Sequence, residues 1–256
     1  MNVESPTRKV SRARDHIKSL DLCATGYTGD KANFVVDESD GTKKFRVVNA
    51  PPIDIAILVG EVLYQLRSAL DHLAFELVKS NRTGVTLPSG WEGKCRLPLL
   101  ATIPRQGIPV SPKFFEASLP GIDMAAFVIV EKLQPYNGGN GPTQLGWINK
   151  LANIDKHRHL HIVAPQAYQT EHIQSAFLDS EVIERLQDGA ELKFPLHSPE
   201  ELLDAVYTNR GIAYPFVSFD ERVLPQELAD VPIDNVLSLC ADTVENIVIP
   251  SFQSLV

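Results

Sequence analysis

Arg67 and His72 lie five positions apart in a stretch of strong helical periodicity, and Asp71 stands between them. An imidazole titrates near neutral pH and can move protons, whereas a guanidinium stays charged and stabilises negative charge. Five residues on an α-helix turn through about 500°, so the Arg67 and His72 side chains diverge by about 140°. Arg67 and Asp71, four apart, are better placed to pair. The segment predicts either a site built on Arg67 and His72 or a solvated helix face with an Arg67–Asp71 ion pair.

A second polar cluster occupies residues 149–161. Asn149, Asn153 and Lys156 recur at helical spacing, and Asn153 and His157 are four apart, opposite an apolar stripe. Amide and cationic side chains in this arrangement are suited to hold a phosphate, and a basic cluster is more informative in an acidic chain. The alternative is a basic helix C-terminus that the helix macrodipole favours.

Three histidines alternate at the end of that cluster, at positions 157, 159 and 161. On a strand they would share one face, about 6.6 Å apart at each step, where two imidazoles can share a metal with Asp155 nearby. The alternative is a helix-to-strand junction. No carboxylate-rich partner motif stands elsewhere in the sequence, so we predict neither a metal nor another cofactor.

The Arg67–His72 spacing in a long helix resembles the RxxxxH motif of the HEPN superfamily (higher eukaryotes and prokaryotes nucleotide-binding). Many members are metal-independent endoribonucleases, often in toxin or antiphage systems. The resemblance implies that His72 is the general base or acid at the ribose 2′-OH and that Arg67 stabilises charge on the phosphate. Asn153, Lys156 and His157 would position that phosphate. It also implies RNA as a partner and a homodimer, because HEPN sites are usually composite between two copies.

Two longer segments, LRSALDHLAFEL and NKLANIDKHRHL with the preceding LQPY, are similar to a group of uncharacterised bacterial proteins. The likeness spans roughly Val59 to Val163. It indicates a shared core and implies no activity. The chain is therefore predicted to be a HEPN-like ribonuclease or an inactive RNA- or nucleotide-binding relative. The alternative is a non-catalytic binding or scaffold protein whose polar helix faces form a homodimer interface.

Helices must position both clusters. Apolar periodicity predicts helices at about 6–22, 53–80, 123–133, 143–157 and 233–249. The helix at 53–80 is the strongest and would span roughly 40 Å. Six prolines between residues 87 and 120 predict an irregular excursion with at most short elements.

Alternating segments predict strands. Asn33–Asp37 and Lys44–Val48 flank an Asp-Gly turn and predict a β-hairpin. Further strand patterns begin at Leu160, His172, Ala190 and Ala213. The predicted fold is α+β: a helical bundle around one long helix, packed beside an antiparallel sheet. We expect a single domain over 1–256, with a helical core at about 53–160 and a β-rich half at about 160–225, closed by a C-terminal helix.

Composition excludes several classes of function. The chain has 256 residues, 44% of them hydrophobic, and a net charge of −8, which argues against non-specific coating of polyanions. Three cysteines without a CxxC argue against a zinc ribbon. P-loop, GxGxxG, GxSxG and HExxH motifs are missing. The charged N-terminus lacks an apolar signal region, and the longest apolar run, within Ile55–Leu63, is too short for a bilayer. We therefore expect a cytoplasmic location and no membrane partner.

Overall fold

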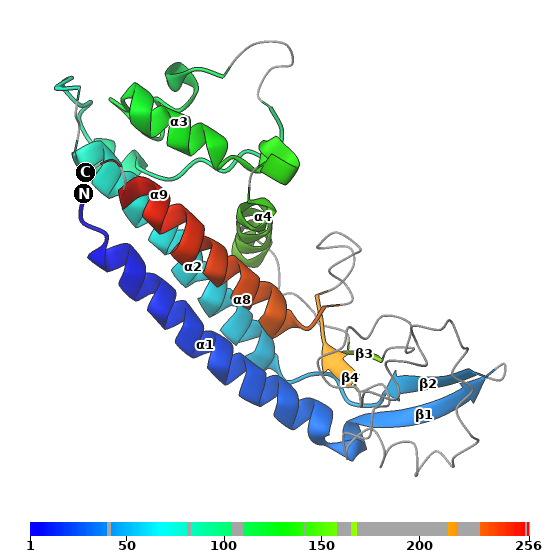
Figure 1. Ribbon diagram of the computed structural model, residues 1–256. Coiled ribbons are helices and arrows are strands. Elements are labelled where there is room, and N and C mark those ends of the chain that lie inside the picture. The colour runs from blue at the N-terminus through cyan, green and yellow to red at the C-terminus, as the bar shows by residue number, and fades with distance from the viewer. Residues whose placement is uncertain are drawn as a thin grey trace. The chain divides into compact units, whose positions relative to one another are not determined.

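The part of the chain that the computed structural model describes is predominantly helical (Figure 1). The structure describes residues 1–39, 42–80, 83–103, 110–140, 142–157, 165–167, 215–219, 231–253 and 255. The chain divides into two compact units. The first comprises Met1–Leu20, Ala56–His161 and Asp234–Val256, and the second comprises Asp21–Ile55 and Ile162–Ile233. The predicted site residues all belong to the first unit.

The long helix α2 (Ile53–Lys79) has the predicted bounds to within one residue. It begins after two prolines, and it carries Asp54 in its first turn and Lys79 in its last, which complements the helix macrodipole. Its apolar stripe is fully buried at Val59, Val62, Leu63, Leu66, Ala69, Leu70, Leu73 and Ala74. This stripe leaves a narrow polar face on which Arg67 and His72 must lie.

Helix α1 (Glu4–Gly29) is longer than its sequence pattern predicted. The expected break near Ala24 is absent, because Ala24 and Tyr27 continue the buried stripe of Val10, Ala13, Ile17 and Leu20. Burial of this stripe outweighs the low helix propensity of Gly26. Pro6 lies in the first turn, where a missing backbone N–H is tolerated.

The C-terminal helical run consists of α8 (Ile233–Thr243), the π-helical turn η6 (Val244–Val248) and α9 (Ile249–Gln253). It extends four residues beyond the predicted end. The wide π turn ends two residues before Pro250, whose ring would crowd the preceding turn of a regular helix. Leu239 and Ile247 of this run are 44% and 48% exposed, although both are apolar.

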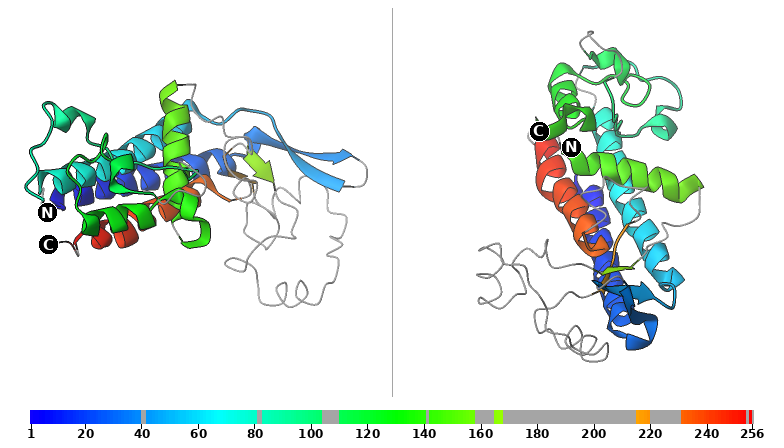
Figure 2. Two further views of the ribbon diagram at one scale, coloured as in Figure 1. Left: turned by 90° about the horizontal axis from the view of Figure 1, so that it is seen from above. Right: turned by 90° about the vertical axis from the view of Figure 1, so that its right-hand side faces the viewer.

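The first 20 residues, α2 and the C-terminal run lie side by side within the first unit (Figures 1 and 2). Arg14 of α1 links two of these elements, since its Nη2 lies 2.6 Å from an Asp242 carboxylate oxygen. Its Nε donates to Glu245 at 2.8 Å. These ion pairs are partly exposed, so they help to orient α1 against the C-terminal run more than they stabilise the contact. Burial of apolar side chains dominates that contact.

Two shorter helices complete the unit: α3 (Met124–Lys132) and α4 (Thr143–His157). Asp123 caps α3, because its carboxylate accepts a hydrogen bond from the Ala126 N–H at 2.8 Å. Helix α4 has the predicted bounds and runs across the direction of α2 (Figure 2). The residues from Pro135 to Asn140 form a 3₁₀ helix, η4.

The proline-rich stretch is irregular, as predicted. Its described part contains only two short 3₁₀ helices, η2 (Trp91–Lys94) and η3 (Pro112–Phe114). Leu97 and Leu99 between them are nevertheless buried, at 0% and 7% exposure. An irregular backbone that approaches the core must find hydrogen-bond partners, which makes this stretch important for the site.

The prediction of an α+β fold with an antiparallel sheet beside the bundle is wrong. In the described residues, β structure is limited to two antiparallel pairs: β1 (Phe34–Ser39) with β2 (Thr42–Val47), and β3 (Pro165–Ala167) with β4 (Pro215–Val217). The first pair confirms the predicted hairpin. Strand patterns in the sequence show which segments could be half-buried, but a covering sheet needs long paired partners, and β3 and β4 have three residues each.

Most of the predicted strands between 160 and 214 lie outside the described residues. The expectation of one domain with a β-rich half at about 160–225 therefore stays a prediction. Over the described part of the chain, the helices are too short or too polar to cross a lipid bilayer.

Replacement of Asp123 by Ala removes the cap of α3. We expect the free energy of unfolding to fall by about 1 kcal/mol, because the Ala126 N–H loses its acceptor. Asp123→Asn retains a side-chain oxygen at the same position and should cost less. Urea unfolding followed by circular dichroism measures both variants. Equal losses for Ala and Asn would contradict the capping role.

Candidate functional site

Arg67 of α2 binds both its helical neighbour and the irregular stretch. Its Nη2 lies 3.0 Å from Asp71 Oδ1 and donates to the Leu97 carbonyl oxygen at 2.8 Å. The Leu97 N–H in turn donates to Asp71 Oδ1 at 3.1 Å. The Arg67–Asp71 ion pair considered from the sequence is thus confirmed. The three groups form a closed ring of hydrogen bonds, in which the Arg67 side chain is only 13% exposed.

Side chains from α2, from α4 and from Gln134, which lies between α3 and η4, fix the backbone of residues 97–100. Besides Arg67 and Asp71 at Leu97, the buried Gln134 donates to the Pro98 carbonyl and accepts from the Leu100 N–H, both at 3.0 Å. Asn149 of α4 donates to the Leu99 carbonyl at 3.2 Å. These side chains belong to the LRSALDH, LQPY and NKLAN segments, so the three sequence motifs meet on one stretch of backbone.

A pocket of about 710 Å³ opens over this backbone. Arg67 and Asp71 line it from α2, and Asn149, Asn153 and Lys156 line it from α4. The structure therefore brings together three of the predicted site residues: Arg67, Asn153 and Lys156.

Two further cations, Lys94 and Arg96, line the pocket from the irregular stretch. The pocket lining therefore contains four cationic side chains, including Arg67 and Lys156, and one carboxylate, that of Asp71. Sequence reasoning missed both, since they stand in a proline-rich stretch without periodicity. The only signal was two basic residues flanking Cys95, which by itself indicates a solvated loop.

Burial raises the pKa of Asp71, and the charge of Arg67 and the Leu97 N–H oppose that rise. A hydrogen-bonded carboxylate beside a guanidinium fixes the orientation of both groups. Arg67 Nη1 is buried and has no hydrogen-bond partner among the described residues. The Nη1 amino group of Arg67 therefore carries two N–H donors without an acceptor among the described residues.

His72 has different neighbours. Its Nδ1 lies 2.7 Å from Ser5 Oγ of α1, and His72 is absent from the described pocket lining. It belongs to a polar seam between α1 and α2, to which the Asn2 N–H adds a hydrogen bond to Glu76 at 3.3 Å. Within this chain, Arg67 and His72 thus face separate surroundings. Their joint catalytic role stays a prediction.

The structure does not describe the side chains of the other residues predicted at a site, which are the histidines at 157, 159 and 161. The backbone of His157 ends α4, but its side chain is not described, and residues 159 and 161 lie outside the described part of the chain. The same holds for the alternative metal site at the alternating histidines. Over the residues that are described, His, Cys, Asp and Glu form no group of three suited to a metal.

Cys95 also lines the pocket, as a half-buried free thiol. Burial raises its pKa to about 11, with a further contribution from the nearby Asp71 carboxylate. A thiol with that pKa is protonated at neutral pH and is a poor nucleophile. The pocket is therefore better suited to binding than to thiolate chemistry.

Comparisons with known proteins do not assign the chain. It matches no protein-family model, no curated protein and no solved structure. The HEPN resemblance consequently rests on the residues alone and stays a prediction.

Neighbouring residues of α2 offer a matched pair of variants. We expect Asp71→Ala to lower the free energy of unfolding by about 2 kcal/mol, since it leaves the Leu97 N–H and the buried Arg67 without their shared acceptor. His72→Ala should cost less than about 1 kcal/mol, because it removes one exposed hydrogen bond. Denaturant unfolding of the two proteins gives the comparison. A larger loss for His72→Ala would contradict the proposed importance of the ring.

Proposed function

We propose that this chain binds RNA through a phosphate held in the pocket of Arg67, Lys94, Arg96 and Lys156, and that it does not cleave the RNA. The observation that carries the proposal is the convergence of these four cations, from α2, the irregular stretch and α4, around one described pocket. The phosphate follows from the charge and donors of the site. RNA as its carrier follows from the HEPN resemblance of the Arg67 segment.

The electrostatic setting favours a local site over a broad binding surface. With a net charge of −8, the chain repels a polyanion at long range. A pocket with excess positive charge attracts phosphate at short range, within a Debye length of about 8 Å at physiological salt. Binding should therefore be salt-sensitive and confined to a few phosphates.

The cationic side chains differ in rigidity. This difference suits a site in which mobile side chains first bind the phosphate and a fixed one then orients it. Lys94, Arg96 and Lys156 are exposed and can follow a mobile backbone phosphate. Arg67 is held by Asp71 and Leu97, so its guanidinium has a fixed direction. Asn153 adds an exposed amide on the same side of α4 as Lys156.

The surroundings of His72 support binding without cleavage. Metal-independent cleavage requires a proton carrier within hydrogen-bonding reach of the ribose hydroxyl. The residue assigned to that role, His72, is hydrogen-bonded to Ser5 on α1 instead of lining the pocket.

Removal of single cations tests the proposal. Lys156→Gln and Arg96→Gln should each weaken binding of a fluorescently labelled single-stranded RNA. Each should also reduce the slope of log K against log salt by about 0.7, the value for one lost contact to a single strand. Fluorescence anisotropy over a salt series measures both quantities. The RNA should stay intact in the presence of a chelator.

The matched control is Lys113→Gln, which removes an exposed lysine of η3 outside the described pocket lining. It should leave the salt slope unchanged. If it weakens binding as much as Lys156→Gln, the binding is diffuse and the assigned pocket is wrong. Shortened RNA that depends on His72 would contradict the non-cleaving part of the proposal.

A further inference from the structure

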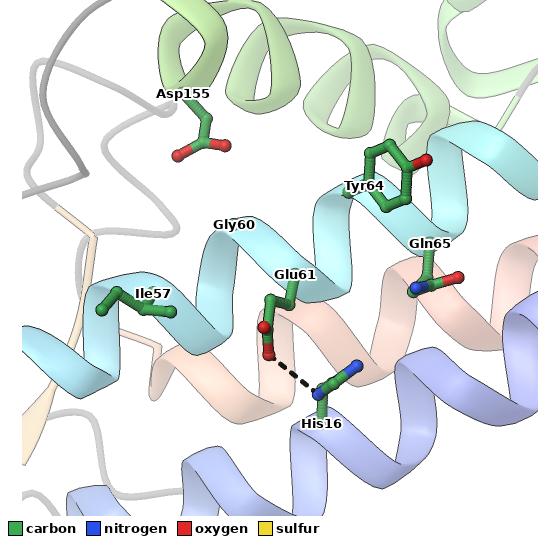
Figure 3. A pocket seen from close by; sticks show the side chains of 7 residues that line it. All are labelled: His16, Ile57, Gly60, Glu61, Tyr64, Gln65 and Asp155. Atoms are coloured by element: carbon green, nitrogen blue, oxygen red, sulfur yellow. Dashed lines mark ion pairs between the residues drawn. The ribbon is translucent and has the colours of Figure 1, made fainter.

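The structure points to a second binding site, independent of the phosphate pocket, and we propose that it takes an alkylguanidinium group such as an arginine side chain. The site is a groove on α2 of about 450 Å³, lined by residues of α1, α2 and α4 (Figure 3). None of its lining residues lines the phosphate pocket. Helix α4 contributes to both, with Lys156 at the phosphate pocket and Asp155 at the groove.

The groove presents acceptors. Glu61 and Asp155 supply two carboxylates, and Glu61 Oε2 lies 3.1 Å from His16 Nδ1 (Figure 3). A ligand for this set of groups must be rich in donors and positively charged.

Gly60 shapes the floor of the groove. A Cβ at this position would lie 3.0 Å from Asp155 Oδ2, a close contact that would push the carboxylate away by a few tenths of an ångström. Glycine in the middle of a helix is less stable than alanine by roughly 1 kcal/mol. Its presence here lets the Asp155 carboxylate approach α2, where Figure 3 shows it directed toward that helix.

Apolar and aromatic side chains complete the groove. Ile57 and Tyr64 line it and are 44% and 62% exposed. The Lys9 ammonium of α1 already lies 5.6 Å from the centre of the Tyr64 ring, so this ring attracts cations. Exposed apolar walls beside carboxylates match a cation on an alkyl stem.

A guanidinium fits these features better than an ammonium does. Its planar fork carries five donors, pairs with carboxylates through two parallel hydrogen bonds, and stacks on aromatic rings. An ammonium offers three donors and is more strongly hydrated. The site therefore discriminates between two cations of equal charge and equal stem.

The test titrates the full-length protein with n-butylguanidinium and, separately, with n-butylammonium, followed by NMR chemical shifts. We expect butylguanidinium to bind with a dissociation constant of about 1 mM, and at least about fivefold tighter than butylammonium. Glu61→Gln and Asp155→Asn should each weaken binding about tenfold through loss of a charge-assisted contact. Circular dichroism confirms that each variant is folded.

Asp15→Asn is the matched control, because it removes an exposed carboxylate of α1 outside the described groove lining. It should bind butylguanidinium as the wild type does. The proposal is overturned if the wild type shows no saturable shifts, if the two cations bind equally, or if Asp15→Asn loses as much affinity as Glu61→Gln.

Discussion

An irregular backbone pressed against helices must find partners for its peptide groups, and the candidate site depends on how this chain meets that constraint. Residues 97–100 form no regular element, yet Leu97 and Leu99 are buried. Their neighbouring peptide groups bind the side chains of Arg67, Asp71, Gln134 and Asn149. Without these contacts, Lys94 and Arg96 would have no defined place beside α2 and α4.

Burial of the apolar stripe of α2 determines which side chains remain available for binding. Since that stripe covers much of the helix circumference, the polar residues are confined to a narrow face and its edges. Neighbouring elements then bind individual polar side chains. Ser5 of α1 forms a hydrogen bond with His72, and the Leu97 carbonyl of the irregular stretch accepts one from Arg67. In this way α2 lines both the cationic pocket and the acidic groove, with different residues in each.

The described structure brings together only some of the residues that the HEPN resemblance assigns to one site. Arg67 lines the same pocket as Asn153 and Lys156 of the second similar segment. His72 lies elsewhere in the same chain, which is the divergence that 140° around a helix would produce. The two similar segments thus supply contacts around residues 97–100 and part of the cationic pocket lining, whereas His72 lies outside that lining.

The sequence alone determined the periodic elements: the helices at 53–79 and 143–157, the hairpin and the irregular proline-rich stretch. These follow from local rules of spacing, capping and turn chemistry. Tertiary structure alone decided the length of α1, the exposure of Leu239 and Ile247, and the separate surroundings of Arg67 and His72. It also placed Lys94, Arg96 and Gln134 at the site. Contacts between distant segments depend on which faces pack together, and local sequence patterns do not encode that choice.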